Sequence, residues 1–107
     1  MENNIIEKVQ RRIEMDKVDF KKYAALVNEL EFLAEQNPSI FKSSDSVEKY
    51  SEIWGELEVL NACMLYEWEK CGKPNDFNKI WTKKYEKDAS NMLSVLLEYL
   101  KTEADKV

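Results

Sequence analysis

Three glutamates on one predicted helix have the residue type and spacing of a metal site. Glu48, Glu52 and Glu56 recur every four residues, so on a helix their carboxylates lie one turn apart on one face. Carboxylate oxygens are the ligands that Mg²⁺ prefers, and a bound Mg²⁺ can assist the hydrolysis of a nucleotide. The all-helical enzymes that do this carry Glu-x-x-Glu pairs, and the chain contains none. We therefore interpret the three glutamates as a solvent-facing surface, and a Mg²⁺-dependent nucleotide hydrolase of all-helical type is the alternative.

The composition excludes most other catalytic centres. The chain has no histidine, and so it has no Ser-His-Asp or Cys-His catalytic group and no histidine-based zinc site. Its two glycines are too far apart for a phosphate-binding loop. Cys63 and Cys71 lie about 12 Å apart along one predicted helix, too far for a disulfide, and we expect both to be small core residues. We predict no catalytic residue, no metal site, no cofactor and no enzymatic activity.

Length and charge narrow the class of protein further. The 107 residues fit one domain, which we place at residues 1–107, and apolar residues make up 44% of it. With a net charge of −5, the chain lacks the basic surface that nucleic-acid binding needs. Its first residues contain no apolar run long enough for a signal peptide, and it has no run of about 18 apolar residues that could span a membrane. We expect a cytoplasmic protein with no nucleic-acid partner and no membrane partner.

Residues 2–36 contain no glycine and no proline. We expect one continuous helix there, which Asn37-Pro38 ends because the residue before a proline is pushed out of the α region. The alternative is a break near Asp16 and Asp19, since either carboxylate can cap a second, shorter helix.

Two further helices are predicted after residue 44. The segment Asp45–Glu48 has the sequence of a capping box, which starts a helix that Gly72 ends. Asn75 or Asp76 then caps the last helix. Short connections make neighbouring helices antiparallel. The predicted fold class is all-α, an antiparallel bundle of three long helices, or of four if the first one breaks near Asp16-Asp19.

Apolar residues recur three and four positions apart in each predicted helix, which is typical of helices packed along a bundle seam. Asp16 interrupts this spacing in the first helix, and Asn61 does so in the second. The predicted core comprises Ile6, Val9, Ile13, Phe20, Tyr23, Val27, Leu30 and Ala34, then Val47, Tyr50, Trp54, Leu57, Met64 and Trp68, and finally Phe77, Trp81, Tyr85, Ala89, Met92, Leu96 and Leu100.

The second predicted helix carries a further stripe of small and apolar residues, nearly opposite its core seam. The stripe consists of Gly55, Val59, Ala62 and Tyr66. A glycine inside a helix costs about 1 kcal/mol relative to alanine, and small residues let another backbone come close. The stripe is either the buried middle of a four-helix arrangement or an interface with a second chain.

The last predicted helix is apolar over more than half of its circumference, wider than the stripe of an ordinary surface helix. Leu93 and Leu97 widen its apolar face in this way. We expect these two residues, with the stripe on the second helix, to bury against another chain, most simply a second copy in a homodimer.

Negative charge gathers at one predicted end of the bundle. Asp45, Glu48, Glu52 and Glu56 begin the second helix, and antiparallel packing puts them beside the acidic residues Glu29, Glu31 and Glu35 of the first. An acidic surface that lacks neighbouring cations speeds the encounter with a basic partner. We expect these four residues to bind another protein that has a basic surface.

Taken together, these features predict a non-catalytic protein-binding module of the small inhibitor, immunity protein, adaptor or chaperone type. It would act through its acidic end and its apolar helix faces. Besides the nucleotide hydrolase, a purely structural oligomer subunit is the other alternative.

Overall fold

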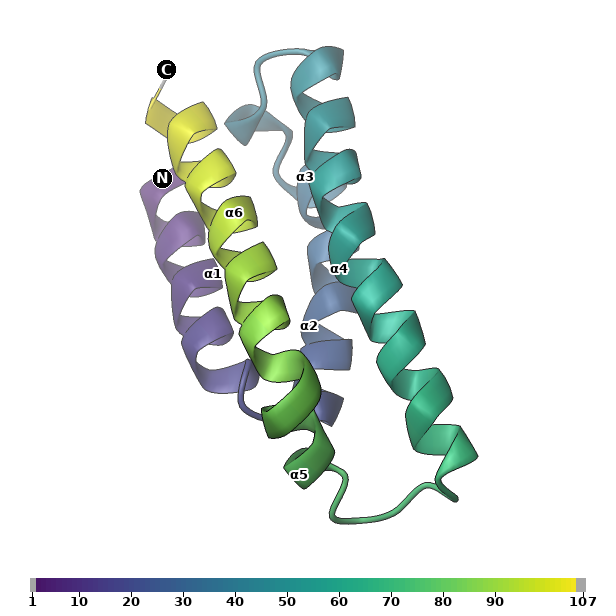
Figure 1. Ribbon diagram of the computed structural model, residues 1–107. Coiled ribbons are helices and arrows are strands. Elements are labelled where there is room, and N and C mark those ends of the chain that lie inside the picture. The colour runs from purple at the N-terminus through teal and green to yellow at the C-terminus, as the bar shows by residue number, and fades with distance from the viewer. Residues whose placement is uncertain (1, 106–107) are drawn as a thin grey trace.

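The computed structural model describes residues 2–105, and these form a bundle of antiparallel helices with no strand (Figure 1). The prediction of an all-α fold is confirmed. In chain order the elements are α1 (Glu2–Asp16), α2 (Phe20–Glu31), α3 (Leu33–Gln36), η1 (Pro38–Ile40), α4 (Ser44–Lys70), α5 (Asn78–Ile80), η2 (Trp81–Tyr85) and α6 (Glu86–Asp105).

The described helices form four arms. They are α1, α2 with α3, α4, and a last arm in which the π-helical segment η2 joins α5 to α6. Helix α1 packs against α2 and α6, and α4 packs against the same two helices from the other side. The start of α1 and the end of α6 lie at the same end of the bundle (Figure 1), which measures 47 × 22 × 20 Å.

The expectation of one continuous helix over residues 2–36 is wrong, and the alternative, a break near Asp19, is correct. Asp19 has extended backbone angles, with φ −133° and ψ 128°. Its Oδ1 accepts hydrogen bonds from the backbone N–H groups of Lys21 at 2.8 Å and Lys22 at 3.1 Å. These are free donors of the first turn of α2, so Asp19 is the N-cap of that helix.

The last arm stabilises this break through hydrogen bonds to the residues between α1 and α2. The side chain of Asn78 accepts a hydrogen bond from the Phe20 N–H at 2.9 Å and donates one to Asp19 Oδ2 at 3.2 Å. The Trp81 indole donates to the carbonyl oxygen of Lys17 at 2.9 Å. The last arm thus satisfies one backbone group at the end of α1 and another at the start of α2.

The start of each later helix differs from the sequence prediction in which residue caps it. Ser43, rather than the Asp45 capping box, is the N-cap of α4, and its hydroxyl oxygen accepts from the Ser46 N–H at 3.2 Å. Neither Asn75 nor Asp76 caps α5, whose N-cap residue Phe77 makes no side-chain hydrogen bond. The end of α4 is as predicted, because Gly72 follows it with a φ of +85°.

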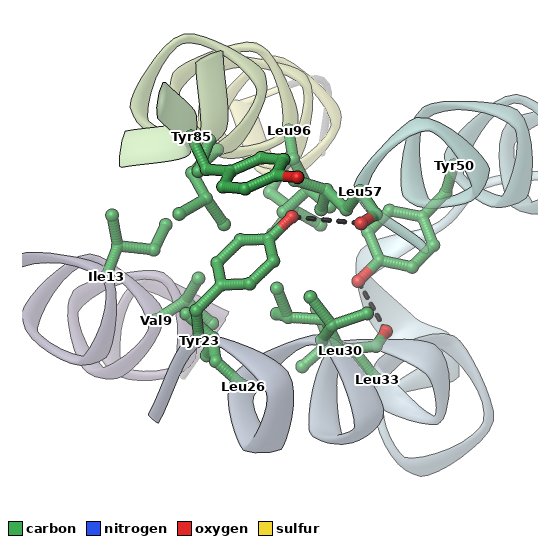
Figure 2. Close-up of a cluster of buried hydrophobic side chains, with 14 of the residues drawn as sticks. Val9, Ile13, Tyr23, Leu26, Leu30, Leu33, Tyr50, Leu57, Tyr85 and Leu96 are labelled. Carbon is green, nitrogen blue, oxygen red and sulfur yellow. Dashed lines mark hydrogen bonds between the residues drawn. The ribbon is translucent and has the colours of Figure 1, made fainter. Parts of the chain in front are cut away.

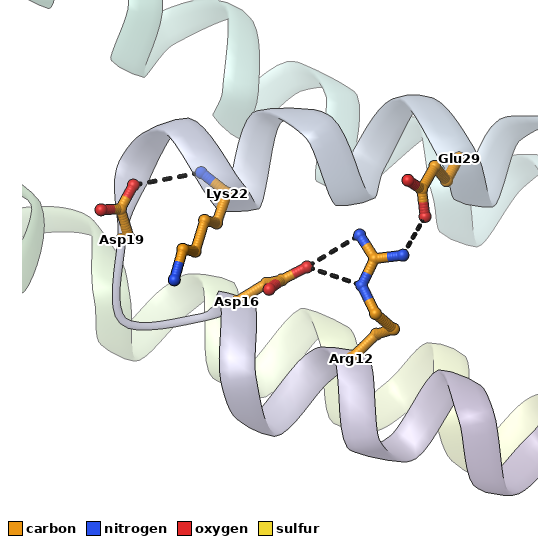
Figure 3. A network of polar contacts seen from close by, with 5 residues as sticks. All are labelled: Arg12, Asp16, Asp19, Lys22 and Glu29. Atoms are coloured by element: carbon orange, nitrogen blue, oxygen red, sulfur yellow. Dashed lines mark hydrogen bonds and ion pairs between the residues drawn. The ribbon is translucent and has the colours of Figure 1, made fainter.

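A polar network ties α1 to α2 (Figure 3). Arg12 of α1 donates hydrogen bonds to Asp16 at 2.9 Å and to Glu29 on α2. Asp16, the one residue that interrupts the apolar spacing of α1, is only 6% exposed and is satisfied by this ion pair. Glu29 therefore faces α1, and its predicted place beside the acidic residues of α4 is wrong.

Aromatic side chains bind backbone carbonyls of neighbouring helices across the core (Figure 2). Tyr23 of α2 donates to the Leu57 carbonyl at 2.9 Å, and Tyr50 of α4 donates to the Leu30 carbonyl at 2.6 Å. Burial raises the pKa of both phenols above the ordinary value, so both stay protonated and act as donors. These bonds satisfy the hydroxyl groups that the core would otherwise leave unpaired.

Most of the predicted seam is buried. Leu57, Met64 and Trp81 are fully buried, whereas Trp54 and Trp68 are half-buried at the edge of the core. Asn61 is buried, at 4% exposed, and its Oδ1 has no hydrogen-bond partner among the described residues.

We expect Asp19→Ala to lower the free energy of unfolding by about 1–2 kcal/mol, because it removes the N-cap of α2. Asp19→Asn keeps an acceptor oxygen and should cost less. Urea denaturation followed by circular dichroism measures both changes. Asp88→Ala, which alters an exposed carboxylate on α6, is the control and should change stability little. Equal stability of Asp19→Ala and the wild type would contradict the assigned cap.

The same cap predicts a dependence on pH. Burial alone would raise the pKa of Asp19, but hydrogen bonds from the Lys22 and Lys21 amides and from Asn78 lower it below its ordinary value. A lowered folded-state pKa adds stability that is present above the unfolded value, about 3.9, and is lost as the pH falls through the folded value. The stability advantage of the wild type over Asp19→Asn should therefore shrink below about pH 4. A constant difference across this range would rule the mechanism out.

Candidate protein-binding face on α4

Helix α4 is covered on its core side and on both flanks. Toward α2, the Trp54 indole donates to the Val27 carbonyl at 2.8 Å. Toward α6, the Ser46 carbonyl accepts from the Tyr99 hydroxyl at 2.8 Å. The fourth side of the helix faces away from the bundle. By helical spacing it carries the residues that we call the α4 outer face: Asp45, Glu48, Glu52, Gly55, Glu56, Val59, Ala62, Cys63 and Tyr66.

The second half of the α4 outer face is apolar and exposed. Val59 and Tyr66 are each 61% exposed, Ala62 is exposed between them, and Gly55 is half-buried. The stripe is therefore not core, although the bundle has four arms. The reason is geometric: α4 packs against two arms of the bundle, the α2–α3 arm and the last arm, and one apolar seam serves both.

Both cysteines are exposed and free, which contradicts the expectation that they belong to the core. Cys63 lies on the outer face, one turn from Val59. Cys71 follows the last turn of α4.

The first half of the α4 outer face is acidic. Asp45, Glu48, Glu52 and Glu56 are all exposed, and none of them forms an ion pair with another residue between 2 and 105. The acidic group and the apolar stripe were separate features of the sequence. On the folded chain they are two halves of one surface, which extends about 30 Å along α4.

The predicted interface role of Leu93 is wrong, because Leu93 is fully buried in the core of this chain. Leu97 is half-buried and packs against the same core. Helix α6 contacts both α1 and α4, and its wide apolar circumference is used within the chain. The prediction assumed a bundle of three helices, in which the last helix would have fewer neighbours to cover its apolar face. The observed bundle has a fourth arm, α1, which covers part of that face.

A polar cluster between α4 and the last arm was not predicted. Glu67 accepts hydrogen bonds from Lys84 at 2.7 Å and from the Tyr85 hydroxyl. The bond from Lys84, with that from Tyr85, lowers the pKa of Glu67 below its ordinary value. Burial is the larger cause that raises the pKa of Tyr85, and the bond to Glu67 is the second, so the proton stays on the phenol. The cluster ties the C-terminal half of α4 to η2.

Metal ligands do not cluster in the part of the chain that the structure describes. No group of three cysteine, aspartate or glutamate side chains between residues 2 and 105 is arranged to hold a metal ion. Over the same residues, no helix has the length and apolar character that crossing a membrane requires.

Comparisons with protein-family models, with curated proteins and with solved structures give no match to this chain.

The two glycines should respond in opposite directions to substitution by alanine. A Cβ at Gly55 would meet nothing within 4 Å, so Gly55→Ala should raise the free energy of unfolding by about 0.5–1 kcal/mol through helix propensity. Gly72 has a φ of +85°, and Gly72→Ala should lower it by about 1 kcal/mol or more. Chemical denaturation of the two variants tests both signs. A loss of stability in Gly55→Ala would show that the backbone there is covered.

Proposed function

We propose that this chain is a non-catalytic module that binds another protein through the α4 outer face. One observation carries the proposal: exposed apolar side chains and carboxylates without ion pairs lie side by side on a single helix face. Apolar groups exclude water in the centre of an interface, and tyrosine is among the residues that contribute most to binding energy. Tyr66 and Val59 supply that centre.

The acidic half of the face supports a basic partner. Glu48, Glu52 and Glu56 lie one turn apart, and like charges at this spacing cost a few tenths of a kcal/mol per pair. Lysine or arginine side chains of a partner would relieve this repulsion on binding. Their attraction would also raise the association rate at low salt.

A second copy of the chain is the competing occupant, as a homodimer or as a subunit of a structural oligomer. The apolar half favours it, because two copies can bury this stripe against each other. The acidic half opposes a parallel pairing, which would bring the carboxylates of the two copies together. If the chain is a small inhibitor, immunity protein, adaptor or chaperone, the α4 outer face would bind the surface of its target protein.

Tyr66→Glu tests the apolar half. We expect it to abolish retention of the partner on an affinity column while the variant stays folded, since Tyr66 packs on nothing in the core. Met15→Glu is the matched control, because Met15 is 63% exposed on α1, diagonally across the bundle. It should leave retention unchanged. Light scattering measures the mass of the wild type and so distinguishes the two possible occupants of the face. A dimer mass that Tyr66→Glu reduces to that of a monomer would identify the occupant as a second copy of the chain and not a basic partner.

The triple variant Glu48→Gln, Glu52→Gln and Glu56→Gln tests the acidic half. We expect unchanged or slightly higher stability of the free protein, a slower association with the partner and a weaker dependence of that rate on salt. Stopped-flow or surface-based kinetics at several salt concentrations measure the effect. A rise in melting temperature of the wild type with Mg²⁺, absent in the variant, would instead support the nucleotide hydrolase.

A further inference from the structure

A hollow of about 330 Å³ lies between the α2–α3 arm and α4, beside the acidic half of the outer face. Aromatic and acidic side chains provide most of its lining, and no basic residue takes part. The principal lining residues are Glu31, Phe32, Glu35, Tyr50, Trp54 and Gly55.

The backbone opens the hollow in two places. Phe32 lies at the break between α2 and α3, with φ −93° and ψ 1°, and the residue is 47% exposed and does not belong to the core. On the facing helix Gly55 has no side chain, and a Cβ there would enter open space. A larger residue at position 55 would begin to fill the hollow.

The polar atoms of two lining aromatic residues are used inside the bundle. The Trp54 indole N–H is bonded to the Val27 carbonyl and the Tyr50 hydroxyl to the Leu30 carbonyl. The half-buried Trp54 ring therefore offers the hollow only carbon surface, whereas Tyr50 is 1% exposed and lies beneath the surface of the hollow. Phe32 and Trp54 form an aromatic wall, in which the hydrogen bond to Val27 fixes the orientation of the Trp54 ring.

The charge of the hollow is negative. Glu31 and Glu35 lie four residues apart, both are exposed, and neither forms an ion pair within the described part of the chain. An aromatic wall beside two carboxylates suits a cation that has a flat apolar face.

We propose that this hollow binds an arginine side chain of the partner protein. The guanidinium group is planar, stacks on aromatic rings and forms paired hydrogen bonds with a carboxylate, whereas the ammonium group of lysine is a compact, strongly hydrated charge. Gly55 belongs both to the hollow and to the α4 outer face, so a partner bound on that face is within reach of the hollow. The inference rests on the proposed function for its partner, and on the hollow alone for its ligand chemistry.

Short capped peptides with one central residue test the ligand chemistry without the partner. The residue is arginine, lysine or citrulline, which keeps the planar shape of arginine but has no charge. We expect the arginine peptide to shift the NMR signal of the Trp54 indole N–H saturably, the lysine peptide to bind more weakly and the citrulline peptide not to bind. Equal shifts with arginine and citrulline, or no saturable shift with arginine, would overturn the proposal.

Two variants remove the site in different ways. The pair Glu31→Gln and Glu35→Gln removes the charge and should weaken arginine-peptide binding about fivefold. Gly55→Leu fills the space and should abolish it, with circular dichroism confirming the fold. The control pair Glu7→Gln and Asp88→Asn makes the same change in net charge at exposed positions elsewhere and should have no effect. A loss of binding in the control as large as in the site pair would contradict a localised site.

The same variants separate this proposal from the proposed function. If partner binding depends on Tyr66 but is unchanged in both hollow variants, the arginine site is wrong and the protein-binding face stands. If the arginine peptide binds as expected and Tyr66→Glu leaves partner binding intact, the hollow stands and the role of the α4 outer face fails.

Discussion

The bundle depends on the clamp that the last arm places on the turn between α1 and α2. Asp19 alone can cap α2, but a cap is worth only about 1 kcal/mol and does not decide whether the preceding helix ends. Asn78 and Trp81 add partners for the Phe20 N–H and the Lys17 carbonyl, the groups that a continuous helix would bond internally. Once these groups are bonded to the last arm, α1 folds back along α2, and its apolar residues reach the same core.

The fourth arm determines which surfaces remain for binding. With α1 beside α6, the broad apolar circumference of α6 is covered within the chain, and Leu93 is buried. Helix α4, packed on α2 and α6, keeps one full side outward. The candidate binding surface is thus confined to the outward side of α4 and to the hollow between α4 and the α2–α3 arm.

Local periodicity predicted the core well, because burial in a helix follows a spacing that the sequence shows directly. Tyr23, Leu57 and Leu96 were assigned to the core in this way and are buried. The break before α2 could not be predicted with the same certainty, since its stabilising partner Asn78 is 58 positions from Phe20 along the chain.

The candidate binding surface was predicted only in part. The four carboxylates were predicted to be exposed, whereas for the stripe from Gly55 to Tyr66 the sequence left two possibilities open, burial within the chain or an interface with a second chain. That the carboxylates and the stripe share one face follows from the helical spacing of α4. The hollow could not be predicted, because it depends on the interruption at Phe32, where no glycine or proline marks the sequence.

The hydrogen bonds from tyrosine and tryptophan to helix carbonyls have a consequence for how the sequence can change. In each of these bonds the donor is a side chain and the acceptor is backbone, as in Tyr23 to Leu57, Tyr50 to Leu30 and Trp81 to Lys17. A carbonyl persists whatever residue carries it, so the accepting positions are free to vary as far as packing allows. In these bonds only the donor depends on the identity of its side chain. A descendant of this chain that loses an aromatic donor loses the hydrogen bond as well, while one that changes an acceptor residue within the limits of packing keeps it.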